Sequence, residues 1–333
     1  MERQRRILIT GGSGFIGTNA VEYFLKKGNS VVSVDINRPR SNGQIRVWRK
    51  CDILDKAQLR AEFQRFDPEW VLHLAARTDL AEKKDTTKYA ANIDGVQNLI
   101  ELIKESPEVQ RVLFASTRMV CRIGYLPKSD IDYCPPNAYG ESKVMGEGLV
   151  RAAGLRCGWI IARPTSIWGP WFDVPYKSFF KSIARGFYFH PADQDPRKSF
   201  GYVENTVFQI ERLMASMSRD VDGRVFYLCD YEPLQLREWA DLIRKEMGLP
   251  LIRSLPFPIL RAAAILGDIA SRLGFKNPPI TSFRLSNLTT EMIYDVSRIE
   301  SIIGPLPFSL QEGVIATVRW MRESGELPFR SPK

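Results

Sequence analysis

TGGSGFIG, residues 10–17, follows the short apolar run 7–9 and leads into a stretch with helical periodicity that continues to about Lys27. Glycines at positions 11, 14 and 17 give the spacing Gly-x-x-Gly-x-x-Gly. A tight glycine turn between a strand and a helix lets a pyrophosphate approach the amide groups at the helix N-terminus. The alternative is a glycine-rich turn with no ligand. The preceding strand and the following helix favour a dinucleotide-binding loop.

Apolar runs alternate with helical periodicity through the first half of the chain, which is typical of repeated βα units. The further expected strands are 31–34, 45–47, 70–74, 111–116 and 158–162, and the further expected helices are 56–65, 86–104 and 137–153. This order predicts an α/β fold with a Rossmann-type, doubly wound parallel sheet. Its ligand site is expected at the carboxyl ends of the strands.

Asp35 ends the second expected strand, where a carboxylate can accept hydrogen bonds from the adenosine ribose hydroxyls. The same carboxylate would repel a 2′-phosphate, so it favours NAD over NADP as the cofactor. Arg38 and Arg40 follow closely and can weaken this preference by supplying countercharge. The alternative is an aspartate that only initiates a turn.

Beyond Arg163-Pro164 the βα rhythm is lost, and proline and aromatic residues become frequent. We expect residues 1–168 to form an NAD-binding Rossmann domain, with a returning segment near 198–229 whose run 225–228 rejoins the main sheet. Residues 169–333 are expected to form mainly a smaller, partly interleaved substrate-binding domain. Trp168, Trp171 and Phe172 are interpreted either as core or as one wall of a substrate cleft.

Composition excludes several classes of protein. The formal net charge is +9, but basic residues are mixed with acids along the chain, so we expect a solvated basic surface and no nucleic-acid partner. Five cysteines without a Cys-x-x-Cys pair favour a reducing, cytoplasmic location. His73 and His190 are the two histidines, so we expect no metal site and no Ser-His-Asp hydrolase. His73 lies in an apolar strand and is interpreted as a satisfied core histidine.

The most apolar later stretch, 257–275, is interrupted by Arg261, Asp268 and Arg272. It is too short to span a bilayer comfortably, so we expect no stable membrane insertion. An amphipathic packing helix is the main interpretation, and contact with a membrane surface is the alternative.

NAYGESK, residues 137–143, places Tyr139 and Lys143 on one face of an expected helix. The alternative is a chance spacing on a solvated helix. Beside a dinucleotide, the lysine ammonium and a positive nicotinamide would lower the pKa of the Tyr139 phenol from about 10 towards neutrality. The phenol would then act as a general acid or base on a substrate hydroxyl, which Ser116-Thr117 would orient.

The glycine-rich loop and NAYGESK occur in the same chain as six further short motifs. These are VDIN at 34–37, CDILD at 51–55, HLAA at 73–76, FAST at 114–117, RPTSIWGP at 163–170 and GYVEN at 201–205. In this combination the sequence resembles the extended short-chain dehydrogenase/reductases, in their NAD-dependent epimerase/dehydratase branch. The resemblance covers nearly the whole chain. It implies that Tyr139 is the catalytic acid/base and that Thr117 orients the reacting hydroxyl. Lys143 would assist Tyr139 and hold the nicotinamide ribose.

The resemblance also implies the other binding residues and a homodimer that packs two helices from each subunit, here near 86–104 and 137–153. Asn92 would have the most structural role, and Arg77, Thr117 and Lys198 would contact the substrate. The implied cofactor-binding residues are Gly11, Gly14, Phe15, Ile16, Gly17, Asp35, Asp52, Ile53, Leu74, Ala75, Ala76, Asn92, Tyr139, Lys143 and Pro164.

Two departures from the family pattern limit the reaction. Dehydratases of the family carry an Asp-Glu pair after the catalytic threonine, where this chain has Arg118-Met119, so a 4,6-dehydratase is not expected. Lys198 stands where many members bind the diphosphate with an arginine, which keeps the charge but not the bidentate fork. The leading hypothesis is a nucleotide-sugar epimerase acting by transient hydride transfer at a sugar hydroxyl carbon. The alternatives are a nucleotide 4-keto-sugar reductase, a 3β-hydroxysteroid-type dehydrogenase and a non-catalytic NAD-binding regulator.

Overall fold

The computed structural model describes residues 3–80, 82, 84–218, 220–275, 278 and 280–327. The ends of the expected domains, residues 1–2 and 328–333, lie outside the described residues. The described chain divides into two compact units. Unit 1 takes the described residues of Met1–Ile167, Val203–Cys229 and Asp295–Pro307, and unit 2 takes those of Trp168–Tyr202, Asp230–Tyr294 and Phe308–Lys333.

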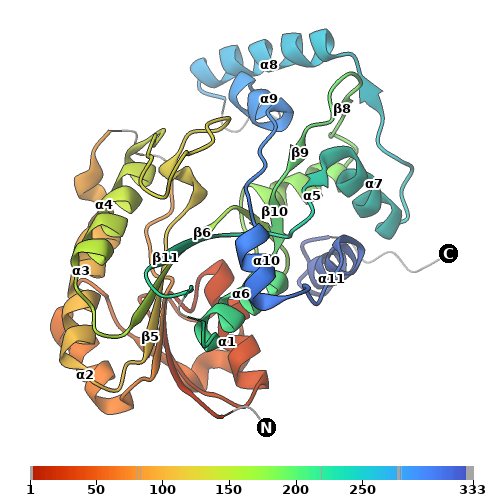
Figure 1. Ribbon diagram of the computed structural model, residues 1–333. Coiled ribbons are helices and arrows are strands. Elements are labelled where there is room, and N and C mark those ends of the chain that lie inside the picture. The colour runs from red at the N-terminus through yellow and green to blue at the C-terminus, as the bar shows by residue number, and fades with distance from the viewer. Residues whose placement is uncertain are drawn as a thin grey trace. The chain divides into compact units, whose positions relative to one another are not determined.

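Seven strands of the described residues form one sheet in unit 1 (Figure 1). They are β1 Arg6–Thr10, β2 Ser30–Asp35, β3 Trp48–Lys50, β4 Trp70–His73, β5 Arg111–Ala115, β6 Gly158–Pro164 and β11 Arg224–Leu228. The order is β11-β6-β5-β4-β1-β2-β3. Every pairing is parallel. The predicted doubly wound parallel sheet is therefore confirmed, including the return of 225–228 to the main sheet.

The third strand was expected at 45–47, and this expectation is wrong. Those residues lie in the 3-10 helix η1, Asn42–Val47, and the strand β3 follows it. Gln44 explains the difference, because its buried side-chain amide donates to the carbonyl of Thr18 at 2.8 Å. The 3-10 helix that contains Gln44 continues to Val47, so the chain becomes extended only from Trp48.

Helices cover both faces of the sheet in unit 1, with α2, α3 and α4 on one side and α1 and α6 on the other (Figure 1). Sheet residues such as Leu8, Val71 and Val112 are fully buried between these layers, where each apolar side chain contributes about 1.5–3 kcal/mol. The helical segments are α1 Phe15–Lys26, α2 Lys56–Phe66, η2 Thr86–Tyr89, α3 Ala90–Glu105, η3 Arg118–Val120, α4 Ala138–Ala152, α6 Val203–Ala215 and α10 Ser297–Ile303.

An aromatic cluster forms the core of unit 2. The rings of Trp168 and Trp239 lie 5.3 Å apart, and Phe172 packs edge-on against Phe180. Trp168 and Phe172 are buried, which favours the core interpretation of both. The helices of this unit are α5 Tyr176–Ala184, α7 Leu236–Glu246, α8 Phe257–Arg272, α9 Ser282–Thr289 and α11 Leu310–Glu323. The remaining short strands are β7 Ser166–Trp168, β8 His190–Pro191, β9 Arg197–Lys198, β10 Phe200–Tyr202, β12 Leu234–Gln235 and β13 Ser254–Leu255.

Helix α8 occupies most of the apolar stretch 257–275 and packs against α9 through Leu260, Ala264 and Leu285. The expected packing helix is therefore present. None of the helices in the described part of the chain is long and apolar enough to cross a membrane.

Candidate active site

The glycine-rich loop between β1 and α1 leaves no room for a side chain at Gly11 or Gly17. Gly11 has a φ of +73°, and a Cβ there would lie 2.5 Å from the amide nitrogen of Ala75. A Cβ on Gly17 would lie 2.1 Å from the carbonyl oxygen of Gly11. Gly14 is the N-cap of α1 and has no side chain to cap it. The start of α1, with Phe15 and Ile16, is thus a backbone cradle of the kind that fits a pyrophosphate.

Asp35 is held beside this loop at the end of β2. One carboxylate oxygen accepts a hydrogen bond from the Ser13 amide at 3.0 Å, and the other accepts from the Asn37 amide at 2.9 Å. A carboxylate has further lone pairs, so it can still accept ribose hydroxyls. Arg40 donates from Nε to the Ser13 carbonyl at 3.0 Å, which ties its guanidinium to the loop.

The expected adenine pair and the stretch after β4 also lie in unit 1. Asp52 is exposed and accepts from the Leu54 amide, whereas Ile53 is buried against Gly95. The three residues after β4 run on from the carboxyl end of that strand, next to the carboxyl end of β1. Leu74 donates its amide to the Thr10 carbonyl, Ala75 donates to the Thr10 hydroxyl, and Ala76 follows. Together with Pro164 at the end of β6, these residues fit a dinucleotide at the carboxyl ends of the strands.

Asn92 is fully buried and connects three segments of the chain. Its Oδ1 accepts from the Arg77 amide at 2.9 Å, and its Nδ2 donates to the Arg77 carbonyl and to the Ser142 hydroxyl. Asn92 therefore clamps the segment after β4 to helix α4, which agrees with the structural role expected of it.

Tyr139, Lys143 and Thr117 are brought together at the carboxyl end of β5, and all three are buried. Helix α4 begins at Ala138 because the Asn137 side chain accepts from the Gly140 amide. The Thr117 side chain lies close enough to the Tyr139 phenol to lower its pKa, and its hydroxyl accepts from the Met119 amide at 3.1 Å. The Lys143 ammonium donates to the Ala115 carbonyl at 2.8 Å. One helix and one strand end thus supply a phenol, an ammonium and a hydroxyl to a single site.

Burial dominates the pKa values of these groups. Desolvation raises the pKa of Tyr139, and the neighbouring Thr117 side chain opposes that rise. Desolvation lowers the pKa of Lys143 to about 8, and the carboxylate of Glu147 opposes that fall. The protein's own groups therefore do not produce the lowered tyrosine pKa that we expected. That expectation included the positive charge of a bound nicotinamide. Arg118 lowers the pKa of Tyr139, but it does not outweigh desolvation.

A buried ion pair beneath the catalytic residues was missed by the sequence reasoning. Glu147 lies one helical turn beyond Lys143, and both its carboxylate oxygens bind Arg163, at 2.8 and 2.7 Å. The carboxylate also accepts hydroxyl hydrogen bonds from Ser116 at 2.6 Å and Tyr133 at 2.8 Å. Burial alone would raise the pKa of Glu147, but Arg163 outweighs it and holds that pKa below its usual range.

The signal for this ion pair was present in the helix periodicity. Residues 139, 143 and 147 recur every four positions and so share one face of α4. A glutamate on the face that carries the catalytic residues is a poor candidate for a solvated position. Its partner Arg163 could not be identified from the sequence, because α4 and β6 come into contact only when the chain folds.

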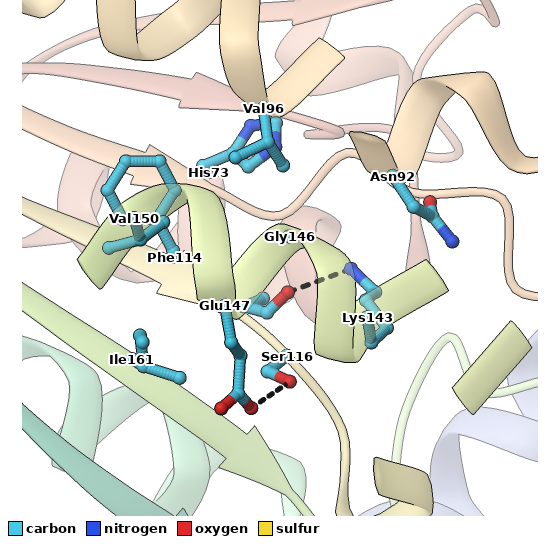
Figure 2. Close-up of a pocket in the computed structure, with 11 residues that line it drawn as sticks. His73, Asn92, Val96, Phe114, Ser116, Lys143, Gly146, Glu147, Val150 and Ile161 are labelled. Carbon is cyan, nitrogen blue, oxygen red and sulfur yellow. Dashed lines mark hydrogen bonds between the residues drawn. The ribbon is translucent and has the colours of Figure 1, made fainter. Parts of the chain in front are cut away.

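Figure 2 shows a small cavity behind Lys143. Its volume is about 20 Å³, enough for one water molecule, and its polar lining includes His73, Asn92, Ser116 and Glu147. His73 is hydrogen-bonded through Nδ1 to the Thr10 hydroxyl at 2.8 Å, and its buried Nε2 has no hydrogen-bond partner among the described residues. Burial lowers the pKa of His73 to about 3, so this imidazole is neutral. The expected satisfied core histidine is thus satisfied at one nitrogen.

The structure places the expected substrate residues Arg77 and Lys198 in separate units. Arg77 forms an ion pair with Asp79, with Nε 2.6 Å from the carboxylate, and donates to the Lys88 carbonyl. Lys198 is buried in unit 2, where its ammonium donates to the main-chain carbonyls of Asn287 and Thr290. Each of these cations is therefore already bonded to groups of its own unit. Substrate binding by Arg77 or Lys198 stays a prediction.

Comparison with known proteins adds a family to this geometry. The model of the NAD dependent epimerase/dehydratase family matches residues 7–229. The chain is 26% identical to 3beta-hydroxysteroid-dehydrogenase/decarboxylase isoform 1 of Arabidopsis thaliana, over 95% of this chain and 80% of that protein. It is 22% identical to the N-acetyl-alpha-D-glucosaminyl-diphospho-ditrans,octacis-undecaprenol 4-epimerase of Escherichia coli O157:H7, over 94% of each.

A solved structure supports the fold. UDP-glucose 4-epimerase of Thermotoga maritima, crystallised with UDP-glucose, matches with a TM-score of 0.72 at 21% identity. The match covers 96% of this chain and 99% of that one. At this identity the likeness shows the fold alone. The reaction must be argued from the site.

Proposed function

This chain belongs to the NAD-dependent epimerase/dehydratase family, as an NAD(P)-dependent enzyme of the extended short-chain dehydrogenase type, and on that premise we propose that it is a nucleotide-sugar epimerase. The observation that carries the proposal is the buried grouping of the Tyr139 phenol and the Thr117 hydroxyl, with Lys143 one turn further along α4. A protein that only binds a dinucleotide needs no such grouping. The arrangement therefore favours catalysis over a regulatory role.

The reaction we propose begins with the substrate hydroxyl hydrogen-bonded to Thr117 and Tyr139. Tyr139 takes the hydroxyl proton as general base and later returns it as general acid. Lys143 favours the phenolate by its charge, and the Ala115 carbonyl fixes the position of its ammonium. NAD, when bound, supplies the hydride acceptor for the sugar carbon. For the configuration to invert, the keto sugar would turn in the site so that its other face meets the cofactor. Thr117 and Tyr139 would again orient its oxygen and Tyr139 would return the proton, with no net change in cofactor.

We propose NAD as the preferred form of the cofactor because Asp35 stands where a 2′-phosphate would be placed. Its carboxylate is fixed by the amides of Ser13 and Asn37, so it cannot easily turn away from the ribose. Arg38 and Arg40 are the nearby cations that could offset it. Arg38 is exposed, and the Nε of Arg40 is engaged by the Ser13 carbonyl. The arrangement therefore favours ribose hydroxyls over a phosphate.

The diphosphate-linked sugar is supported by two of the similar proteins. One is named for an undecaprenol diphosphate sugar and another was crystallised with UDP-glucose. Arg118 and Met119 replace the acidic pair of dehydratases, so dehydration is not proposed. A nucleotide 4-keto-sugar reductase would use the same three side chains and differs in consuming NADH at each turnover.

A 3β-hydroxysteroid-type dehydrogenase is the second candidate, and Lys198 is the observation that favours it. A diphosphate needs a cation free to bind it, whereas the Lys198 ammonium is buried on the carbonyls of Asn287 and Thr290. An apolar alcohol needs no such cation. The relative in Arabidopsis thaliana is named for hydroxysteroid chemistry.

One experiment separates these reactions. Purified protein with catalytic NAD would be given UDP-glucose, UDP-N-acetylglucosamine or a 3β-hydroxysteroid, and product formation would be followed together with absorbance of reduced nicotinamide. An epimerase accumulates product without a matching change in NADH. In a parallel assay with excess NAD, one-for-one production of NADH with the steroid would establish the dehydrogenase. In a third assay with added NADH and a nucleotide 4-keto-sugar, one-for-one consumption of NADH would establish the reductase.

We also propose a cytoplasmic homodimer. The described structure holds the five cysteines as free thiols, which fits a reducing compartment. The expected dimer helices correspond to α3 and α4, which pack side by side in unit 1, and Met145 on α4 is 45% exposed. Light scattering during size exclusion would test the dimer, and Met145→Glu should convert it to a monomer. Elution of the wild type as a monomer would contradict the proposal.

A further inference from the structure

Helix α8 in unit 2 is apolar on two opposite faces. One face, with Leu260 and Ala264, packs against Leu285 of α9. The other face is exposed although it carries aliphatic side chains, with Leu266 at 67% and Leu273 at 83% exposure. We call this exposed side the apolar face of α8, and its residues are Ile259, Ala262, Ile265, Leu266, Ile269 and Leu273.

The spacing of these residues makes the apolar face continuous. Residues 259, 262, 266, 269 and 273 recur at intervals of three and four, so they form one stripe along the helix. Phe275 beyond the helix and Phe283 on the neighbouring α9 are also exposed, at 64% and 66%. Figure 1 shows α9 beside α8. A contiguous apolar surface of this kind marks an interaction site on a globular protein.

The charges on α8 itself are two arginines and one aspartate. They are Arg261, Arg272 and Asp268. Arg261 and Arg272 lie eleven positions apart, which is three helical turns, so both stand along the same edge of α8 next to Ile265. Both arginines are exposed. The Asp268 carboxylate accepts from the Ser282 amide at 3.2 Å.

We propose that the apolar face of α8 binds the surface of a lipid bilayer that carries anionic headgroups. The aliphatic side chains would enter the boundary between headgroups and acyl chains, and the guanidinium groups of Arg261 and Arg272 would lie level with the phosphates. The helix would lie in the plane of the membrane. It has 16 residues and is about 24 Å long, which is less than a bilayer core of about 30 Å.

A second copy of the chain fits this face less well than a membrane does. Two copies meeting through the stripe would each bring two arginines to the seam. The acid available on α8 to pair with them is Asp268, which is already engaged by Ser282. An anionic lipid surface supplies the missing negative charge along with the apolar phase.

The proposal is tested by flotation of the full-length protein with lipid vesicles. The vesicles contain either phosphatidylcholine alone or phosphatidylcholine mixed with phosphatidylglycerol. We expect the wild type to float with the mixed vesicles, to float less with phosphatidylcholine, and to be released as salt is raised. The readout does not depend on activity, so failure of the proposed reaction leaves it unaffected.

Two double variants separate the apolar and charged contributions. Leu266→Ser with Leu273→Ser should weaken partitioning at least about tenfold for each leucine, because less apolar surface enters the lipid. Arg261→Gln with Arg272→Gln should weaken binding to the mixed vesicles about fivefold for each charge. Leu126→Ser and Arg156→Gln are the matched controls, since both residues are exposed in unit 1. Melting temperatures confirm that each variant is folded.

Three outcomes would overturn the proposal. The first is a wild type that floats with neither kind of vesicle. The second is a folded serine double variant that floats as well as the wild type. The third is a lipid-independent dimer that the serine double variant converts to a monomer, which would make a second copy the occupant of this face.

Discussion

Helix α4 of unit 1 and helix α8 of unit 2 place charged and apolar side chains in opposite ways. In unit 1 the carboxylate of Glu147 and the guanidinium of Arg163 are almost completely buried, and each is paired. In unit 2 Leu266 and Leu273 stand exposed on a helix whose other face is already packed. Burying a charge costs far more than exposing a leucine, so the burial of Glu147 depends on its pairing with Arg163 and on the hydroxyls of Ser116 and Tyr133.

The difference indicates which residues hold the candidate active site in place and which do not. The buried charges of unit 1 hold the ends of β5 and β6 against α4, where the phenol and the ammonium of the site must be placed. The exposed leucines of unit 2 add nothing to its internal packing. Substitutions in unit 1 should therefore change catalysis and stability, whereas substitutions on the exposed face of α8 should change neither.

The largest effect on activity is expected for Tyr139→Phe, which removes the phenol hydroxyl from the candidate active site in unit 1. Turnover should fall by about 10²–10⁴-fold, because the proton route is lost while the pocket is kept. Affinity for NAD and melting temperature should stay close to those of the wild type. Tyr125→Phe is the control, since its hydroxyl bonds Asp132 on a surface loop. A variant that keeps most of its kcat would remove Tyr139 from the mechanism.

Glu147→Gln should destabilise the protein by about 3–5 kcal/mol, because the Arg163 guanidinium loses its buried counter-charge. The matched change in unit 2 is Glu326→Gln, whose partners Lys177 and Lys181 are partly exposed, and it should cost at most about 1 kcal/mol. Denaturant unfolding monitored at several wavelengths measures both. Equal losses for the two variants would contradict the contrast between the units.

Asp35→Ala should lower the affinity for NAD about ten- to a hundredfold, because hydrogen bonds between a charged group and the ribose are lost. The affinity for NADP should fall less, so the gap between the two cofactors narrows. Dissociation constants from fluorescence quenching test this, with Asp94→Ala on the exposed side of α3 as control. Tighter binding of NADP by the wild type would show that nearby arginines override the carboxylate.

His73 should make the stability of the protein depend on pH. Its folded pKa is lowered by burial to about 3, so below pH about 6.5 the unfolded chain takes up a proton that the folded chain refuses. The free energy of unfolding should therefore decrease by about 1.4 kcal/mol for each pH unit below that value. His73→Asn keeps an acceptor for Thr10 and should remove this part of the slope. An unchanged slope in the variant would show that His73 is protonated in the folded state.

Local signals made much of unit 1 predictable. The glycine turn, the helix that follows it and the alternation of strands with helices are each encoded within a few consecutive residues. The prediction of the third strand was wrong because it depended on a distant contact. Gln44 donates a hydrogen bond to the carbonyl of Thr18, which lies 26 residues away in the sequence. Periodicity reports only on residues that are close in the sequence, so it could not indicate the contact between Gln44 and Thr18.

Unit 2 offered fewer such signals. Its core is a cluster of rings drawn from several segments, and its apolar helix α8 gives no indication in sequence of which face will be covered. Lys198 shows the limit most clearly, since its ammonium binds carbonyls 89 and 92 residues further along the chain. The segment 295–307, with helix α10, belongs to unit 1 although nothing in its sequence points there.

The pairing of β11 with β6 has a consequence for how the chain is made. Tyr227 of β11 pairs with Arg163 of β6, so 64 residues separate the partners and most of them belong to unit 2. A ribosome adds about 5–20 residues each second, so β6 waits several seconds for its outer neighbour. During that interval the apolar edge around Ile160 and Ile161 is open to pairing with another nascent chain. The return of a single short strand is therefore also the step that ends a period of exposure to aggregation.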